Sequence, residues 1–210
     1  MGVAVLVLGG SGAGKSTALR NFEPNEIGII NVASKPLPFR KKMNVYDTSD
    51  YNTIYKVIES AKLNGYAIDD AGYLMQFENL TRVKEQGYQK YTEMAVHFAN
   101  LFTLIRKAPD DVIVYILAHT QTNDDYTKSI KTIGRMLDEK ICVEGLVTIC
   151  IMAEQTDEGH VFYVNDYLGT PAKSPLEMFK ESKIENDLKL VDTTIREYYG
   201  LKAIDKVERS

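Results

Sequence analysis

The stretch from Val3 to Thr17, VAVLVLGGSGAGKST, constrains the fold of this chain more than any other. Its first six residues, Val3 to Leu8, are all apolar and rich in valine, which is typical of a buried β-strand. The residues that follow match the pattern G-x-x-x-x-G-K-[ST] from Gly9 to Ser16. That motif requires a strand before it and a helix after it, and the helix-compatible residues 16–20 complete the expected context.

The spacing of the glycines predicts a loop that binds the phosphates of a nucleoside triphosphate. Glycine permits a tight concave turn without Cβ clashes, so the backbone N–H groups point inward at phosphate oxygens and the start of the following helix adds its positive end. Lys15 is placed to reach the β- and γ-phosphates, and the Ser16 hydroxyl to ligate Mg²⁺. The residues expected to bind the cofactors, ATP and Mg²⁺, are Gly9, Gly10, Ser11, Gly12, Ala13, Gly14, Lys15, Ser16 and Thr17.

Length and composition predict a single α/β domain with no membrane segment. A hydrophobic fraction of 44% and a charged fraction of 26% over 210 residues are ordinary for a globular chain, and we expect one domain over residues 1–200 with a charged, frayed tail over 201–210. No apolar run approaches the ~20 residues that span a bilayer, and no basic segment precedes the first apolar run as in a signal peptide. Cys142 and Cys150 are expected to be reduced core residues. We therefore expect a cytoplasmic protein.

The segment Tyr66–Asp70, YAIDD, has the form of a short strand that ends in two acids. Asp69 would hold Mg²⁺ through water, and Asp70 would orient or activate the attacking water. Strand-then-acid patterns are common, so this interpretation depends on the phosphate loop upstream. Residues 69–72 also fit the D-x-x-G of a GTPase, but the guanine-reading N-K-x-D is absent from the chain.

The run Val112–Ala118, VIVYILA, predicts a central strand of a parallel sheet that is covered on both faces. It leads into His119, Thr120 and Gln121. Polar residues at the carboxyl end of such a strand face the ligand crevice, so His119 or Gln121 is expected to contact the γ-phosphate or the attacking water. A strand end that simply faces solvent is an equal alternative.

Strands and helices alternate along the rest of the chain, which predicts a doubly wound, mainly parallel sheet with helices on both faces. The further expected strands cover residues 26–32, 43–46 and 146–153, and an antiparallel hairpin leads from the last of these into 161–164. The expected helices cover 51–63, 73–80, 88–107, 132–140 and 184–199. Residues 122–131 are expected to be a polar loop that is long enough to suggest a function.

Several segments together resemble the phage-encoded RecA/AAA-like ATP-binding proteins, a group that includes the Sak-type single-strand annealing recombinases. The matching segments are GGSGAGKST, NVASKPLPF, AIDDAGYLM, ILAHTQ and IKTIGRMLDEKICVEG. The resemblance implies a RecA-like P-loop ATPase that acts on DNA in recombination or single-strand annealing, as a homo-oligomeric ring or filament in the host cytoplasm. It also implies that a basic residue of a neighbouring subunit completes the ATP site, and the candidates are Lys128, Lys131 and Arg135.

One segment departs from that group. RecA-type enzymes carry a catalytic glutamate after the second strand, whereas this chain reads Val32-Ala33-Ser34-Lys35 there. Asp70 would have to substitute, so hydrolysis is expected to be slow or to need DNA or a partner. Two other functions stay open. One is a nucleoside or nucleotide kinase, although the chain has no arginine-rich lid, and the other is an ATP-gated scaffold that binds without hydrolysing.

Single-stranded DNA is the expected polymer partner, although a net charge of −4 does not itself favour nucleic acid. The expected contact segments are 122–131 and the basic stretch Lys35–Lys42. Tyr126 or Phe39 would stack on bases, with ordinary packing as the alternative for both.

Overall fold

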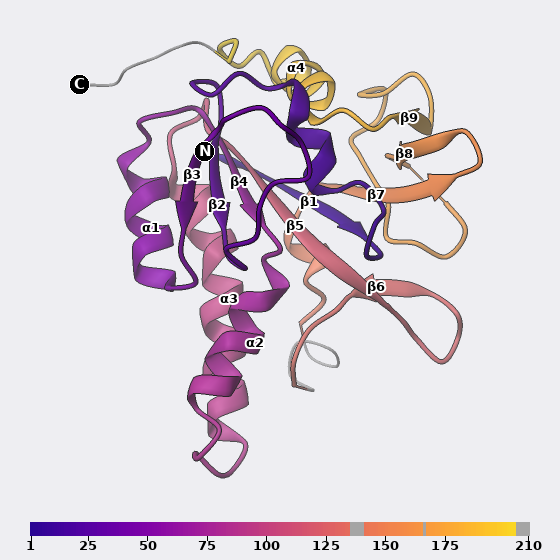
Figure 1. The fold of residues 1–210 in the computed structure, drawn as a ribbon. Helices are drawn as coiled ribbons and strands as arrows, with labels where there is room; N and C mark the ends of the chain where they lie inside the picture. The colour runs from indigo at the N-terminus through magenta and orange to yellow at the C-terminus, as the bar shows by residue number, and fades with distance from the viewer. Residues whose placement is uncertain (135–140, 166, 205–210) are drawn as a thin grey trace.

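The computed structural model describes residues 1–134, 141–165 and 167–204. Within this part of the chain, nine strands form one sheet in the order β3-β2-β4-β5-β1-β7-β8-β9, and β6 pairs with β5 beside this row (Figure 1). The parallel strands are β3 (Asn44–Asp47), β2 (Gly28–Asn31), β4 (Gly65–Asp69), β5 (Ile113–Thr122), β1 (Val3–Gly9) and β7 (Ile149–Thr156). The antiparallel additions are β8 (Gly159–Tyr163) on β7, β9 (Lys183–Glu185) on β8 and β6 (Lys128–Ile130) on β5.

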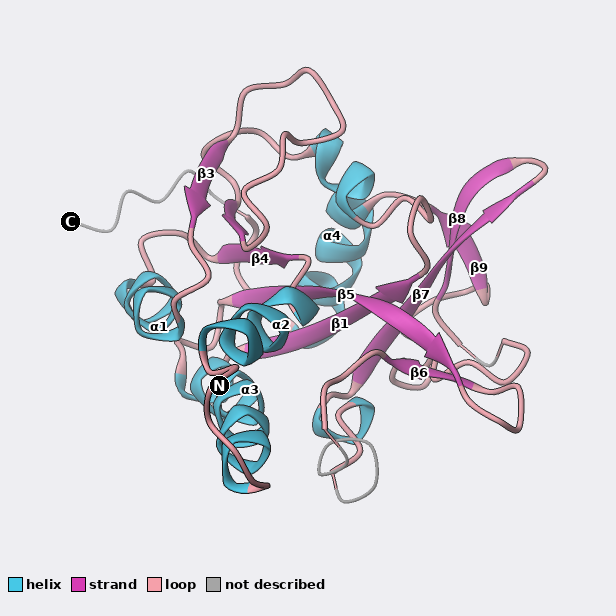
Figure 2. Cartoon of the chain, turned by 60° about the horizontal axis from the view of Figure 1, so that its bottom comes forward, coloured by secondary structure: helices cyan, strands magenta, loops and turns pink. Residues whose placement is uncertain are grey.

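Helices cover both faces of the sheet (Figure 2). Three helices contribute to one core cluster on one face of the sheet. They are α1 (Tyr51–Ser60), α2 (Gly72–Thr81) and α3 (Gln89–Lys107). The opposite cluster contains the 3-10 helix η1 (Ser16–Asn21) and α4 (Leu188–Tyr199). A second 3-10 turn, η3 (Glu144–Leu146), precedes β7.

The continuous apolar run of β1 follows from this two-sided burial. Leu6 and Leu8 belong to the cluster beneath α1, α2 and α3, whereas Val5 and Val7 belong to the cluster beneath η1 and α4. Successive side chains of a strand point to opposite faces, so a strand covered on both sides must be apolar at every position. The predicted α/β architecture with an antiparallel edge hairpin is therefore confirmed.

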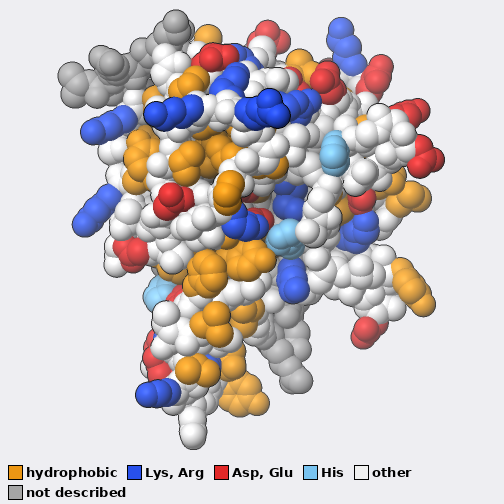
Figure 3. Space-filling view, viewed as in Figure 1, with side chains coloured by type: hydrophobic (Ala, Val, Ile, Leu, Met, Phe, Trp, Pro, Cys, Tyr) orange, Lys and Arg blue, Asp and Glu red, His pale blue; other side chains and the backbone are white. Residues whose placement is uncertain are grey.

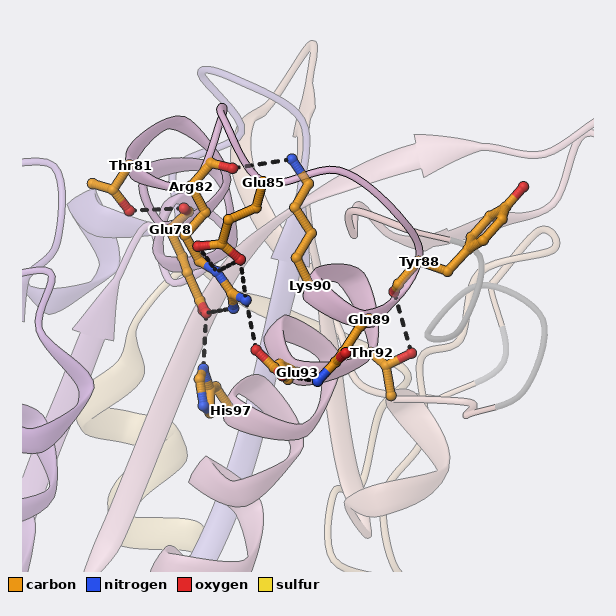
Figure 4. Close-up of polar contacts among 10 residues, drawn as sticks. All are labelled: Glu78, Thr81, Arg82, Glu85, Tyr88, Gln89, Lys90, Thr92, Glu93 and His97. Carbon is orange, nitrogen blue, oxygen red and sulfur yellow. Dashed lines mark hydrogen bonds and ion pairs between the residues drawn. The ribbon is translucent and has the colours of Figure 1, made fainter.

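Helices α2 and α3 extend away from the sheet and are joined by a turn at their far end (Figure 1). Arg82, directly after α2, bonds to Glu78 at 3.1 Å, to Glu85 at 2.6 Å and to Glu93 of α3 at 2.5 Å. Glu78 also contacts His97 Nδ1 at 2.9 Å (Figure 4). One guanidinium thus ties both helices and the turn together.

Three predicted segments have a different structure. The loop predicted over 122–131 is shorter, because β5 continues to Thr122 and pairs with β6 (Lys128–Ile130), so only residues 123–127 form the turn of a β5–β6 hairpin. The last helix begins at Leu188 rather than at residue 184, because residues 183–185 pair with β8 and Asp187 caps the helix. Of the helix predicted over 132–140, residues 132–134 are not helical and the remainder lies outside the described residues.

Two smaller expectations also change. Cys142 is exposed, whereas Cys150 is buried as predicted. Residues 201–204 of the predicted tail pack on the domain: the Leu201 N–H donates to the Arg196 carbonyl at 2.8 Å, and the Ala203 carbonyl accepts from Asn64 at 3.1 Å. Residues 205–210 lie outside the described part. None of the helices within the described ranges has the length and apolar character that a membrane span requires.

Candidate functional site

The glycine-rich loop lies between β1 and η1, at the carboxyl end of β1. Gly12 and Gly14 have φ of +78° and +92°, a region that residues with side chains rarely adopt. A Cβ on Gly14 would also lie 2.9 Å from the ring of His160. Because η1 is a 3-10 helix of six residues, the amides of the loop, rather than a long helix dipole, supply most of the attraction for an anion.

The side chain of Lys15 folds back over this loop. Its Nζ donates to the carbonyl oxygens of Gly9 and Gly10, each at 2.9 Å, and lies 3.4 Å from Nδ1 of His119. The residue is only 5% exposed. Burial lowers the pKa of the ammonium, although the charges of Asp70 and Asp69 act in the opposite direction.

Ser16 and Asp69 form an oxygen pair beside the loop. The Ser16 hydroxyl donates to Oδ1 of Asp69 at 2.7 Å, and Asp69 is the last residue of β4. Burial raises the pKa of Asp69, and the bond from Ser16 only partly offsets this rise. The described residues contain no cluster of three or more His, Cys, Asp or Glu suited to a metal, so a cation here would complete its shell with water and ligand oxygens.

Asp70 follows directly and has a left-handed backbone, with φ of +56°. Its Oδ1 lies 3.3 Å from Nε2 of His119, and its Oδ2 accepts a hydrogen bond from the ammonium of Lys35. Burial alone would raise the pKa of Asp70, but the bonds from His119 and Lys35 outweigh it and lower the pKa to about 2. The carboxylate is therefore charged at neutral pH, with both oxygens engaged.

His119 lies between the glycine-rich loop and Asp70. It pairs in register with Gly9 across β1 and β5, and its two ring nitrogens face Lys15 and Asp70. Gln121 lies two positions further along β5, opposite Ser129 of β6, and is outside the lining of the pocket. Of the two predicted sensor residues, only His119 thus lies at the loop.

The loop, Lys15, Ser16, Asp70 and His119 line one pocket of about 280 Å³ that is more polar than apolar, and Asp69 is not part of its lining. Four lining residues were not predicted at the nucleotide site: Lys35 and Pro38, from the loop after β2; Tyr73, from α2; and His160, from β8, whose Nε2 lies 2.8 Å from the Gly12 carbonyl. Figure 3 shows one face of the molecule, and Lys and Arg side chains gather near the top of that face. The full lining is Ser11, Gly12, Ala13, Gly14, Lys15, Ser16, Thr17, Lys35, Pro38, Asp70, Tyr73, His119 and His160.

Of the residues predicted to act on a neighbour or on DNA, Lys35 lines this pocket, whereas Lys128, Lys131, Tyr126 and Phe39 are not among its lining residues. Lys128 bonds to Glu154 of its own chain at 2.5 Å, and Lys131 is exposed just after β6. Arg135 lies outside the described residues. Tyr126 is 86% exposed in the β5–β6 turn, whereas Phe39 packs partly buried against the core.

No family model and no curated protein matches this chain. Among solved structures, it is similar to the P4 protein from bacteriophage phi6 in complex with ADP, with 16% sequence identity and a TM-score of 0.43. The match covers 77% of this chain and 57% of that chain, so the chain spans little more than half of that protein's length. A likeness at this level carries no argument about function. In this chain a glycine-rich loop follows a central strand of a mainly parallel sheet, and helices cover both faces of that sheet. This arrangement is the fold of a P-loop NTPase.

Proposed function

We propose that this chain is an ATP-binding protein and a slow, Mg²⁺-dependent ATPase that acts on DNA. The observation that carries the proposal is the convergence of three groups at one loop: the Lys15 ammonium, the Ser16 hydroxyl and the Asp69 carboxylate. Lys15 and Ser16 follow β1 at the end of the glycine-rich loop, and Asp69 ends β4. The two strands are part of one parallel sheet and end at the same edge, where ligands of open α/β sheets bind.

Each group suits one part of a bound nucleotide. The loop amides would donate to phosphate oxygens, and Lys15 would exchange its bonds to the Gly9 and Gly10 carbonyls for bonds to phosphate. Ser16 and Asp69 would hold Mg²⁺, directly and through water. Such a set fits Mg²⁺, which is usually held by one or two carboxylates together with substrate phosphates and retained waters. The ion would supply charge neutralisation on the phosphates.

The environment of Asp70 favours an orienting role over proton abstraction. A general base works best with a pKa near the operating pH, whereas the pKa of Asp70 is about 2. The carboxylate can still fix the position of a water by accepting a hydrogen bond from it. Slow intrinsic hydrolysis follows from this, in keeping with the lack of a glutamate after β2.

A specific observation also supports the non-hydrolysing scaffold as a second candidate. Each Asp70 oxygen already has a partner, His119 or Lys35, so a water at Asp70 must share its oxygen with that partner, which weakens the hold on the water. The kinase alternative has less support, because the described residues that line the pocket include no arginine, whereas such kinases gather arginines in a lid over the transferred phosphoryl group.

The DNA part of the proposal depends on the surface around the pocket. The exposed Tyr126 on the β5–β6 hairpin offers a ring for base stacking. The loop after β2 carries Arg40, Lys41 and Lys42, of which Lys41 also bonds to Glu23 at 3.0 Å. The proposal also includes a homo-oligomeric ring or filament, in which Lys131 of one subunit would lie near the pocket of the next.

The deciding experiment measures ATP binding and ATP turnover of the purified chain, with and without single-stranded DNA. We expect the wild type to bind ATP, to hydrolyse it slowly and to be stimulated by DNA. Lys15→Ala should abolish all three. Lys56→Ala, on the exposed face of α1, is the control and should behave as wild type. Binding without turnover in either condition would favour the scaffold. Turnover that ignores DNA but rises with added nucleosides would favour the kinase. No binding would overturn the proposal.

A further inference from the structure

Lys35 reaches into the pocket from a position on its rim. Its side chain is 58% exposed, yet its ammonium bonds to Asp70, whose side chain is 8% exposed. The same ammonium lies 5.4 Å from the centre of the Tyr73 ring. An exposed lysine that contacts a buried carboxylate has room to leave it, because its flexible stem lies largely in solvent.

The backbone of Lys35, in contrast, is held in place. The side-chain amide of Asn31, the last residue of β2, donates to the Lys35 carbonyl at 2.9 Å and accepts from the Lys35 N–H at 3.3 Å. Asn31 is itself buried and bonds to Asp47 of β3 at 2.8 Å. Pro36 and Pro38 restrict the chain that follows. Only the side chain of Lys35 is therefore free to respond to a ligand.

The charges in the pocket explain why the Lys35 side chain would move when a phosphate binds. Lys35 and Lys15 line the same pocket. Lys15 is buried, and its ammonium rests on the carbonyl oxygens of Gly9 and Gly10. A phosphate that binds Lys15 thus enters the field of both cations. The negative charge of a terminal phosphate would compete with Asp70 for the Lys35 ammonium, while Asp70 keeps its contact with His119.

We propose that Lys35 distinguishes ATP from ADP: its ammonium leaves Asp70 for the terminal phosphate of the triphosphate and stays on Asp70 when the diphosphate is bound. This inference rests on the proposed function, because it requires a nucleotide at the loop. Its consequence is that the triphosphate removes the ammonium from Oδ2 of Asp70 and leaves that oxygen to accept hydrogen bonds from water alone. The site would then hold a water more firmly when a terminal phosphate is present.

The test is calorimetric titration of the purified full chain with Mg²⁺ and either ADP or β,γ-imido ATP, a triphosphate that is not hydrolysed. Lys35→Met keeps most of the stem and removes the charge. We expect it to weaken triphosphate binding by about tenfold or more, as for a lost charge-assisted hydrogen bond, and ADP binding by less than about threefold. Lys35→Arg keeps the positive charge, so it should retain most of the wild-type preference for the triphosphate over ADP. Lys56→Met, at an exposed position of α1 outside the lining, is the matched control and should change neither affinity.

The outcomes separate this inference from the proposed function. If wild type binds both nucleotides and Lys35→Met weakens both equally, or neither, the discrimination by Lys35 is overturned while nucleotide binding stands. If wild type binds neither, the proposed function itself fails. Should Lys35→Met not fold, Asp70→Asn releases Lys35 from its resting partner. The triphosphate should then gain more affinity than ADP, and equal gains would refute the role of Lys35.

Discussion

Ser16 and Asp69 are joined by a 2.7 Å hydrogen bond although 53 positions separate them in the chain. Their strands are not even neighbours, because β5 lies between β1 and β4. The contact forms because all three strands are parallel and end at one edge of the sheet, where the residues after each strand converge. The pair is thus a product of topology, and the proposed function assigns its hydroxyl and its carboxylate to one Mg²⁺.

Asp69→Asn tests the role of that pair, since it keeps the shape of the side chain and removes the charge. We expect the Mg²⁺ concentration for half-maximal ATP turnover to rise by about 10- to 100-fold, the usual cost of disturbing a group that supports a bound metal. Ser16→Ala should shift it in the same direction, and Asp124→Asn, on the exposed β5–β6 turn, should not. An unchanged Mg²⁺ dependence in Asp69→Asn would remove Asp69 from the cation site.

Asp70→Asn should retain nucleotide binding and lose turnover. An amide at this position cannot carry the negative charge that now faces His119 and Lys35, and it accepts a hydrogen bond from water less strongly than a carboxylate does. Single-turnover kinetics, with the enzyme in excess over ATP and at a concentration above Kd, separate the two effects, because binding and chemistry are then measured apart. Turnover at the wild-type rate would show that Asp70 does not position the water.

The strands and the outline of the site could be predicted from the sequence because their signals are local. The apolar runs that became β1 and β5 are buried on both faces, and the motif from Gly9 to Ser16 specifies its own backbone. Asp69 was predicted because a short apolar run ends in two acids downstream of the phosphate loop. His119 was predicted because polar residues at the carboxyl end of a central parallel strand face the ligand crevice, and the structure adds its register with Gly9.

The residues that were missed depend on long-range geometry. Lys35 reaches Asp70 only because Asn31 holds its backbone, and nothing in a basic, proline-containing segment indicates that bond. His160 reaches the Gly12 carbonyl through the pairing of β7 with β8, in which it opposes Gln155. The β5–β6 hairpin was predicted as a loop because its residues are mostly polar and lack a clear alternation.

The cap of α1 allows a prediction about stability. Oδ2 of Asp50 accepts from the Thr53 N–H at 2.9 Å and from the Thr53 hydroxyl at 2.7 Å, and these bonds lower the pKa of Asp50. A group whose pKa is depressed on folding contributes stability above its unfolded pKa of about 3.9, and this contribution is lost as the pH falls through the folded value. Asp50→Ala should therefore cost about 1 kcal/mol of the free energy of unfolding at pH 7, and less near pH 3.

Urea denaturation at the two pH values measures this difference. Asp50→Ser keeps a capping oxygen without a titrating group, so its stability relative to Asp50→Ala should not depend on pH in this range. An equal cost of Asp50→Ala at both pH values would mean that the charge of the cap contributes nothing.

The proposed contribution of Lys131 from a neighbouring subunit can be tested by mixing two inactive variants. Lys131→Ala keeps its own Asp70, and Asp70→Asn keeps its own Lys131. In a head-to-tail ring or filament, a site regains both groups when a Lys131→Ala subunit receives Lys131 from an Asp70→Asn neighbour. For random mixing at equal amounts this holds at about one site in four, so turnover should recover to about a quarter of wild type. Mixing Lys15→Ala with Asp70→Asn is the control and should give none, because those two groups must lie in the same subunit. If the first mixture is as inactive as its components, Lys131 does not act across an interface.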